Sequence, residues 1–331
     1  MTYPKARTVL GLAAAAVVAA GVTVATGSYG SAEAQQDAAP VAVAAESSPV
    51  GYASQNGGTT GGAGGTTVTV TNASQFLQYA QASGRYVIQV NGTISLSGMQ
   101  DVASDKTIIG VGTNGRITGG GLDIDGVRNV IIRNLTFTGA GDDAINVQDG
   151  STNIWIDHND LSDASDGLVD IKRGSDFITV SWNRFHDHDK TSLVGHSDDN
   201  GSQDQGHLRV TYVHNWFQGT NQRHPRVRFA NPVHVLNNYY SNIGSYGAAS
   251  TTNAGVFVEN NYFENVSRPT SIQEGSSPEG NIRASGNYLV NSGSIVTRNP
   301  GSVAAIPYSY TAENAANVKA TVTAGAGVGK I

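Results

Sequence analysis

The sequence predicts an all-β fold, a right-handed parallel β-helix with an N-terminal capping helix. Glycine accounts for 41 of 331 residues and charged residues for only 14%, which is typical of turn-rich β structure rather than helix bundles. Six stretches share the pattern apolar-x-apolar-x-x-Asn-x-apolar, and their asparagines are 24, 32, 23, 23 and 26 residues apart. This period suits a coil of three short strands and three turns.

The repeated unit predicts a strand that ends at its asparagine. Alternating apolar residues give the strand one buried face, and asparagine can turn the chain because it tolerates left-handed backbone and bonds locally. Stacked coils would align the asparagines in a ladder of side-chain amides. The asparagines are Asn159, Asn183, Asn215, Asn238, Asn261 and Asn287.

Other β architectures do not fit this period. The hairpins of an antiparallel sandwich would recur about every 8–12 residues, and a leucine-rich repeat would show a leucine signature. Neither pattern is present. The longest interval, between Asn183 and Asn215, predicts an inserted loop of about nine residues, and insertions in solenoids are often on the binding face.

The chain before the repeats divides into three parts. Residues 1–34 have the basic start, apolar run and Ala32-Glu33-Ala34 end of a secretory signal, so we expect a secreted protein; a membrane anchor is the weaker alternative. Residues 35–66 are rich in Gly, Ala, Ser and Thr, which predicts a flexible lead-in. Residues 67–331 are the predicted β-helix domain, held by packing alone because the chain has no cysteine.

The start of this domain predicts the capping helix. Residues 68–70 alternate like a strand, and residues 71–75 resemble a helix start. Phe76, Tyr79 and Ala80 would form its apolar face, Gly84 would end it, and residues 86–90 return to a strand.

Acidic side chains gather before and within the central repeats. Asp142, Asp143, Asp166 and Asp170 would make an oxygen-rich site for a hard cation, Ca²⁺ before Mg²⁺. Four residues of extended strand span about 13 Å, so Asp166 and Asp170 can share an ion only if the chain bends between them, at Gly167. The alternative is that these are turn aspartates bonding to their own backbone.

Cationic side chains follow the acidic ones along the chain. Lys190 ends the run His-Asp-His-Asp-Lys, and Arg223, Arg226 and Arg228 lie within six residues. Clustered arginines repel one another unless they meet anions, and arginine forks match carboxylates, so an acidic polymer is the natural partner. The net charge of −6 argues against nucleic acid. Zinc binding at His186 and His188 lacks further ligands at a supporting spacing.

A family resemblance rests on several motifs in the same order. They are WIDH at 155–158, DGLVDIK at 166–172, TVSWN at 179–183, HDHDKT at 186–191, VTYVHN at 210–215 and RHPRVRF at 223–229. As a set they resemble the pectate lyases of polysaccharide lyase family 1, over roughly residues 67–331. The resemblance implies Ca²⁺-dependent β-elimination of de-esterified polygalacturonate, an acidic polysaccharide, by a secreted enzyme.

The resemblance also assigns site residues. It implies Ca²⁺ ligands at Asp143, Asp166 and Asp170, with the choice between Asp142 and Asp143 open. It implies Arg223 as the proton abstractor. Lys190 and Arg228 would hold substrate carboxylates, and Lys172 would approach the substrate. An arginine base works only if its surroundings lower its pKa, so activity rising into alkaline pH is expected.

Three alternatives remain beside this interpretation. A pectin lyase acts on methyl-esterified chains without Ca²⁺, but Asp166 and Asp170 argue against it. A polygalacturonase has an aspartate pair like Asp142-Asp143, but its other motifs are missing. A non-catalytic pectin-binding β-helix is the third alternative, and the intact Lys190 and arginines speak against it. A capped solenoid needs no partner, so we expect a monomer with no membrane contact after signal removal.

Overall fold

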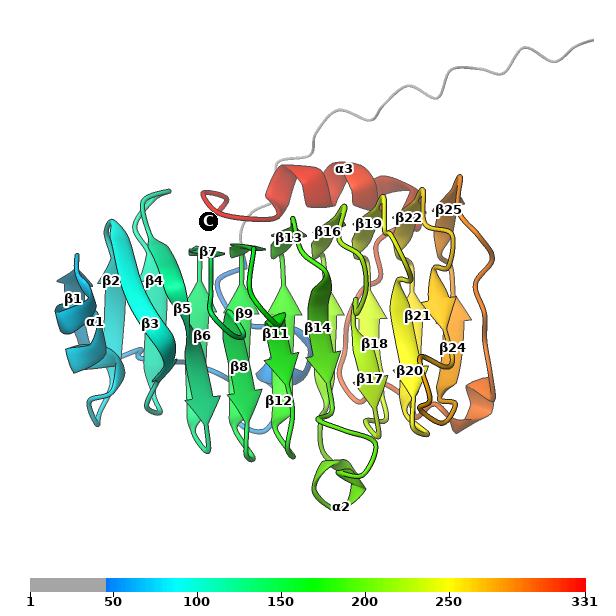
Figure 1. The fold of residues 1–331 in the computed structure, drawn as a ribbon, viewed down its shortest axis with the longest axis horizontal. Helices are drawn as coiled ribbons and strands as arrows, with labels where there is room; N and C mark the ends of the chain where they lie inside the picture. The colour runs from blue at the N-terminus through cyan, green and yellow to red at the C-terminus, as the bar shows by residue number, and fades with distance from the viewer. Residues whose placement is uncertain (1–45) are drawn as a thin grey trace, which may run out of the picture. The chain divides into compact units, whose positions relative to one another are not determined.

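The computed structural model describes residues 46–331, so the expected signal peptide at 1–34 lies outside the described residues. Parallel strands stack into the predicted β-helix (Figure 1), and each coil of the stack is called a rung below. Ten strands form one sheet, with one strand from each rung. They are β1 (Thr66–Val70), β2 (Tyr86–Val90), β4 (Lys106–Gly110), β6 (Arg128–Arg133), β9 (Thr152–Asp157), β12 (Asp176–Ser181), β15 (Val210–Val213), β18 (Val233–Leu236), β21 (Gly255–Glu259) and β24 (Asn281–Ser285).

A second sheet of 15 strands covers two further faces, because the long strand β5 (Arg116–Asp125) pairs with both β7 and β8. The long strand β3 (Thr93–Asp101) pairs with β5 along both parts and spans both faces too. On the first face lie β8 (Ile145–Gln148), β11 (Gly167–Ile171), β14 (Lys190–Val194), β17 (Arg226–Arg228), β20 (Ala248–Thr251) and β23 (Thr270–Ser271). On the other lie β7 (Thr136–Thr138), β10 (Asp160–Ser162), β13 (Arg184–His186), β16 (Trp216–Gln218), β19 (Tyr239–Ser241), β22 (Tyr262–Glu264) and β25 (Tyr288–Val290).

The predicted asparagine ladder is confirmed. From Asn159 to Asn287 each side-chain amide donates to the side-chain oxygen of the next asparagine, at 2.9–3.1 Å. The five from Asn159 to Asn261 are fully buried. Inside the coil, one continuous apolar core runs from Val70 to Ile282.

The left-handed residue of each turn differs from the expectation. Positive φ falls on the residue before each ladder asparagine rather than on the asparagine itself, at His158, Trp182, His214, Asn237, Asn260 and Gly286. The preceding residue therefore carries the turn conformation, while the asparagine side chain bonds across rungs.

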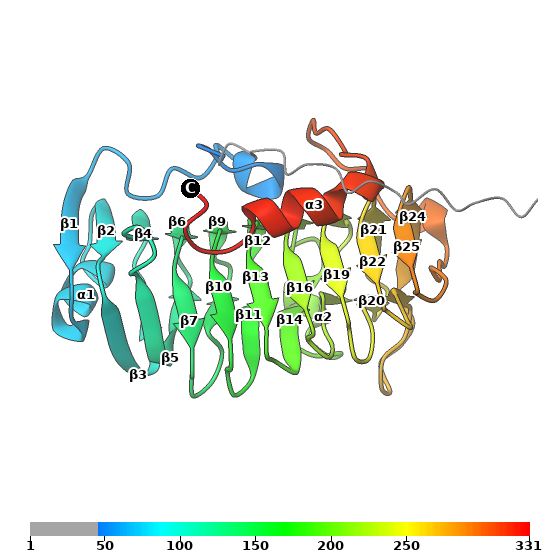
Figure 2. The same cartoon turned by 90° about the horizontal axis from the view of Figure 1, so that it is seen from above.

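Helices close the sides and one end of the stack. The expected capping helix is α1 (Ala73–Ala80); the Asn72 side chain accepts from the Gln75 backbone at 3.0 Å, and Phe76 and Ala80 are buried. An unpredicted helix, α3 (Ala315–Gly325), lies along β13, β16, β19 and β22 (Figures 1 and 2). Its Val318 and Val322 pack against Trp182 and neighbouring tyrosines.

The described part of the expected flexible lead-in is packed instead. We call residues 46–65 the strap, which includes the 3-10 helix η1 (Gly51–Ser54) and crosses the ten-stranded sheet (Figure 2). Tyr52 and Ala53 are buried, and their amides donate to Thr211 and Thr179 hydroxyls at 3.1 and 3.0 Å.

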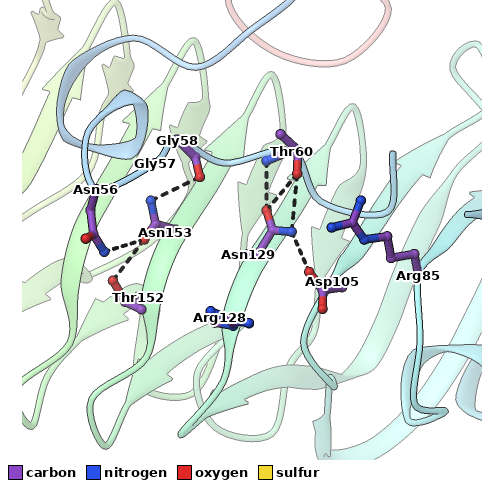
Figure 3. Close-up of a pocket in the computed structure, with 10 residues that line it drawn as sticks. All are labelled: Asn56, Gly57, Gly58, Thr60, Arg85, Asp105, Arg128, Asn129, Thr152 and Asn153. Carbon is purple, nitrogen blue, oxygen red and sulfur yellow. Dashed lines mark hydrogen bonds between the residues drawn. The ribbon is translucent and has the colours of Figure 1, made fainter. Parts of the chain in front are cut away.

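Asparagines of the sheet also hold the strap (Figure 3). Asn129 accepts from the Thr60 amide at 2.7 Å, and Asn153 donates to the Gly58 carbonyl at 3.2 Å. Asn129 also accepts from the Gly61 amide at 2.8 Å, and Asn153 also donates to the Gln55 carbonyl at 2.9 Å. A small residue is needed at Gly62 because the strap lies close to the sheet there. A Cβ at Gly62 would lie 1.9 Å from the Tyr86 carbonyl oxygen.

The predicted insertion is the loop at 195–209 between β14 and β15, and it carries the short helix α2 (Gly201–Asp204) (Figure 1). A second 3-10 helix, η2 (Pro300–Ser302), precedes α3. Among residues 46–331 no helix is both long and apolar enough to cross a membrane.

Breaking the ladder should destabilise the fold strongly. Asn215→Ala removes donors to Asn238 and to the Val180 carbonyl and leaves buried Asn183 groups without an acceptor. We expect a loss of about 3 kcal/mol or more in the free energy of unfolding, since each orphaned buried group costs roughly 1–3 kcal/mol. Asn114→Ala, which removes an exposed amide contact with Asn91 at 3.2 Å, is the control and should cost under about 1 kcal/mol. Equal losses in chemical denaturation would contradict the role of the ladder.

Candidate functional site

The sequence-predicted site residues meet on one face of the 15-stranded sheet, at β8, β11, β14 and β17. Asp143 precedes β8, Asp166 precedes β11, Lys190 begins β14 and Arg223 precedes β17, so these four lie at the same ends of neighbouring strands. Lys172 follows β11 and Arg228 ends β17, at the opposite strand ends.

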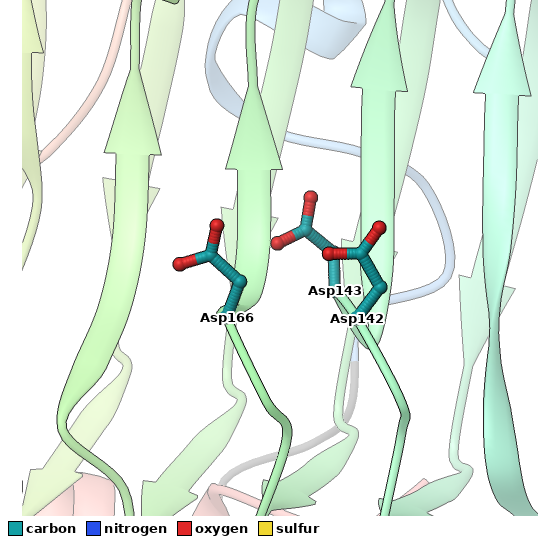
Figure 4. A group of neighbouring side chains, drawn as sticks. All are labelled: Asp142, Asp143 and Asp166. Atoms are coloured by element: carbon teal, nitrogen blue, oxygen red, sulfur yellow. The ribbon is translucent and has the colours of Figure 1, made fainter.

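Three carboxylates gather at the first of these ends (Figure 4). Oxygens of Asp142, Asp143 and Asp166 all lie within 4.8 Å of one another, from two neighbouring rungs. The sequence left open whether Asp142 or Asp143 is a metal ligand, and in the structure both belong to this group. Asp143 is buried, while Asp142 is exposed.

Asp170 lies outside this group of three but beside it. A Cβ placed on Gly167 would be 2.3 Å from an Asp170 oxygen and 2.9 Å from an Asp143 oxygen, so both carboxylates border the space that this glycine leaves open. Asp166 precedes the strand and Asp170 lies within it, with Gly167 between them. The Gly167 amide donates to Asp143 at 2.7 Å, and the Leu193 amide donates to Asp170 at 3.0 Å.

The negative charges of these aspartates lie close together, and nearby cations offset them only in part. Burial and the nearby Asp143 carboxylate raise the pKa of Asp170 to about 8. Burial also raises the pKa of Asp143, although Lys172 opposes this from 3.1 Å. Burial disfavours the charged form of Lys172, but Asp143 and Asp170 outweigh it and raise its pKa. Such an arrangement of oxygen donors suits a hard cation better than a set of free carboxylates.

Two cations lie against Asp166. Lys190 Nζ is 3.1 Å from its carboxylate oxygen, and Arg223 Nη1 is 3.9 Å from the same oxygen. Arg223 has a left-handed backbone at φ 64°, and its buried Nε has no hydrogen-bond partner among the described residues. Its backbone carbonyl accepts from the Ser192 amide at 2.8 Å, which fixes it to β14.

Arg228 already has an anionic partner that the sequence did not reveal. Its Nε donates to Asp198 at 2.7 Å, and Asp198 belongs to the inserted loop. The repulsion predicted among the three arginines is thus partly offset by partners within the chain. Besides the Arg228–Asp198 pair, Arg226 donates to Ser277 at 2.7 Å and to the Glu274 carbonyl at 3.1 Å. The 32-residue interval indicated the insertion, but no pattern indicated which of its residues would reach an arginine.

The buried His224, directly after Arg223, holds this part of the chain in place through hydrogen bonds. Its Nδ1 donates to the Tyr246 carbonyl at 2.8 Å, so its Nε2 accepts from the Thr220 hydroxyl at 2.8 Å. Tyr240 donates to the His224 carbonyl, also at 2.8 Å. The ring is fully buried, and burial lowers the pKa of His224 to about 4. Neutral His224 therefore anchors the chain directly after Arg223.

Comparisons with known proteins agree with these motifs. A family model described as "Pectate lyase" matches residues 13–331. A pectate lyase of Emericella nidulans is 46% identical over 232 residues, covering 67% of this chain and 70% of the relative. A pectate trisaccharide-lyase of Bacillus licheniformis is 41% identical over 307 residues, covering 85% and 86%.

A solved structure is similar throughout its length. It is a pectate lyase from Bacillus sp. N165 in complex with trigalacturonate, with a TM-score of 0.79 and 37% identity. The match covers 85% of this chain and 99% of that one.

Acid should destabilise the protein through His224. Its folded-state pKa lies below the unfolded value of about 6.5, so the unfolded state binds more protons and stability falls as pH drops from about 6.5 to about 4. Protonation of His224 alone should lower the free energy of unfolding by about 2 kcal/mol between pH 7 and pH 5. Denaturant unfolding of wild type and His224→Asn across this range tests it. The variant should show a shallower pH slope, and an unchanged slope would contradict the assignment.

Proposed function

This chain belongs to the pectate lyase family and is a polysaccharide lyase, and we propose that it cleaves de-esterified polygalacturonate by Ca²⁺-dependent β-elimination. The products would be oligogalacturonides with a 4,5-unsaturated end. The similar pectate lyase from Bacillus sp. N165 is in complex with trigalacturonate, which supports this substrate class.

One observation carries the proposal. A single carboxylate oxygen of Asp166 lies 3.1 Å from Lys190 and 3.9 Å from Arg223, within the group formed with Asp142 and Asp143. A candidate base, a candidate carboxylate binder and an acidic cation site therefore meet at one point, as elimination next to a substrate carboxylate requires.

The residues present fit a calcium ion. Asp142, Asp143 and Asp166 would hold it, with Asp170 beside the space at Gly167. The raised pKa values of Asp143 and Asp170 reflect burial with too little positive charge nearby, which a bound divalent cation supplies. When bound, Ca²⁺ would act as a Lewis acid toward the galacturonate carboxylate.

The chain's own cations perform the remaining roles. Arg223 would take the proton from C5, which is acidic because it lies α to a carboxylate. The C5–H electron pair then forms the C4=C5 bond, the C4–O4 bond breaks, and the leaving oxygen takes a proton from solvent. Lys190, Lys172 and Arg228 would hold substrate carboxylates as charge builds on them. An arginine acts as a base only in its neutral form, so activity should increase into alkaline pH.

The remaining expectations form part of the same proposal. An extracellular polymer as substrate is consistent with secretion directed by residues 1–34. The enzyme would act as a monomer, because α1 and the C-terminal segment cover parts of the stack within one chain.

Metal removal gives the first test. Polygalacturonate incubated with the protein and Ca²⁺ should gain ultraviolet absorbance, because the new double bond is conjugated to the carboxylate, and excess chelator should abolish the gain. New reducing ends without absorbance would indicate a hydrolase. Binding without either signal would indicate a non-catalytic module, and absorbance on methyl-esterified pectin that survives chelation would indicate a pectin lyase.

The base assignment predicts a defined kinetic loss. Arg223→Lys keeps the positive charge near Asp166 but moves the basic nitrogen, so kcat should fall at least about 100-fold with KM within a few-fold. The control is Arg116→Lys, an exposed arginine whose side chain has no polar partner among the described residues, and it should retain full activity. A kcat for Arg223→Lys within tenfold of wild type would exclude Arg223 as the base.

A further inference from the structure

Arg228 differs from the other candidate site cations in its partner. Lys172 is paired with Asp143, while Lys190 and Arg223 lie near Asp166, so all three face the acidic group. Arg228 instead pairs with Asp198 from the inserted loop. A cation held by the acidic group would compete for Asp143 and Asp166, but it would leave the Arg228–Asp198 pair intact.

The Asp198 carboxylate is firmly held. One oxygen accepts from Arg228 Nε at 2.7 Å and from the Thr252 hydroxyl at 2.8 Å, and the other accepts from the Ser277 hydroxyl at 2.6 Å. Partial burial opposes its charge, but the bonds from Ser277, Arg228 and Thr252 prevail and lower the pKa of Asp198 to about 2. Asp198 is therefore ionised at any working pH, and it cancels the charge of Arg228.

The pair still leaves part of the arginine fork available. Arg228 Nη1 donates to the Gly195 carbonyl at 3.3 Å, and its Nη2 has no partner among the described residues. Asp198 and Gly195 thus fix the guanidinium with one edge free for a ligand.

We propose that Asp198 is a specificity-determining residue that lets the site accept a methyl-esterified galacturonate unit beside Arg228. This inference rests on the proposed function, in which Arg228 faces a substrate carboxyl group. Because the Arg228–Asp198 pair is neutral overall, an uncharged ester there leaves no unpaired cation behind. A free carboxylate there gains less, because it shares the guanidinium with a second carboxylate.

Removing the Asp198 charge should therefore sharpen the preference for de-esterified substrate. Asp198→Asn keeps the shape and an oxygen acceptor for Arg228 Nε. We expect the ratio of kcat/KM on polygalacturonate to kcat/KM on methyl-esterified pectin to rise about tenfold, mainly through a lower KM for polygalacturonate, with kcat within twofold.

A matched control separates charge from local structure. Thr252→Val removes one hydrogen bond to Asp198 but keeps its charge, so it should leave the ratio unchanged. If Asp198→Asn lowers kcat/KM equally on both substrates, or leaves the ratio as in wild type, Asp198 only supports the loop and the inference is wrong.

If Asp198→Asn fails to fold, a measurement on the wild-type protein can still test the inference. Mass spectrometry of the products from partly methyl-esterified pectin should find ester groups at one preferred position relative to the unsaturated end. Products with esters at random positions, or with none, would overturn the inference while leaving the lyase intact. Absence of any unsaturated product would instead mean that the proposed function itself has failed.

Discussion

The buried asparagine ladder is the interaction on which the rest of the structure depends. Each buried amide joins two rungs, so a shift of one residue in any of these rungs would leave several buried polar groups without a hydrogen-bond partner. The ladder thereby fixes the register of the six rungs that it joins. Rungs about 4.8 Å apart then bring side chains from different coils within contact distance.

Because the rungs are this close, charged side chains that are far apart in the sequence come together in the site. Carboxylates come from the rungs of β8 and β11, while the cations come from β11, β14 and the segment around β17. Each rung contributes between one and three of these groups, and no rung alone holds the whole site. Burial makes every pair matter more, as the raised pKa of Asp170 shows, because little solvent screens the excess negative charge.

Sequence reasoning succeeded where periodicity carries the information. The strands, the ladder, α1 and the inserted loop all follow from spacing, and the motifs located the face on which the acidic and cationic groups meet. It failed where contacts depend on non-periodic segments. Asp198 lies in the insertion, whose path no repeat dictates, and the partner of Arg228 was therefore missed.

Other differences have similarly local causes. The apolar residues of α3 are only alanine and valine, so its packing against Trp182 depends on a surface that exists only after folding. The glycines of the strap predict flexibility by composition, yet Gly62 serves close contact with the Tyr86 carbonyl. The left-handed turn residue precedes each ladder asparagine, which a propensity argument about asparagine alone assigns to the wrong position.

The strap also imposes an order on events during folding. A solenoid whose rungs touch only their neighbours can grow from any point along its length. The strap, however, is made early by the ribosome and bonds to Thr179 and to Thr211, which is 159 residues beyond Tyr52. The docking surface for Tyr52 and Ala53 does not exist until β12 and β15 have formed, whereas Gln55, Thr60 and Gly61 bond to the earlier rungs through Asn153 and Asn129. The first part of the strap must therefore remain unpaired until more than half of the chain has emerged, and its docking then couples distant rungs into one cooperative unit.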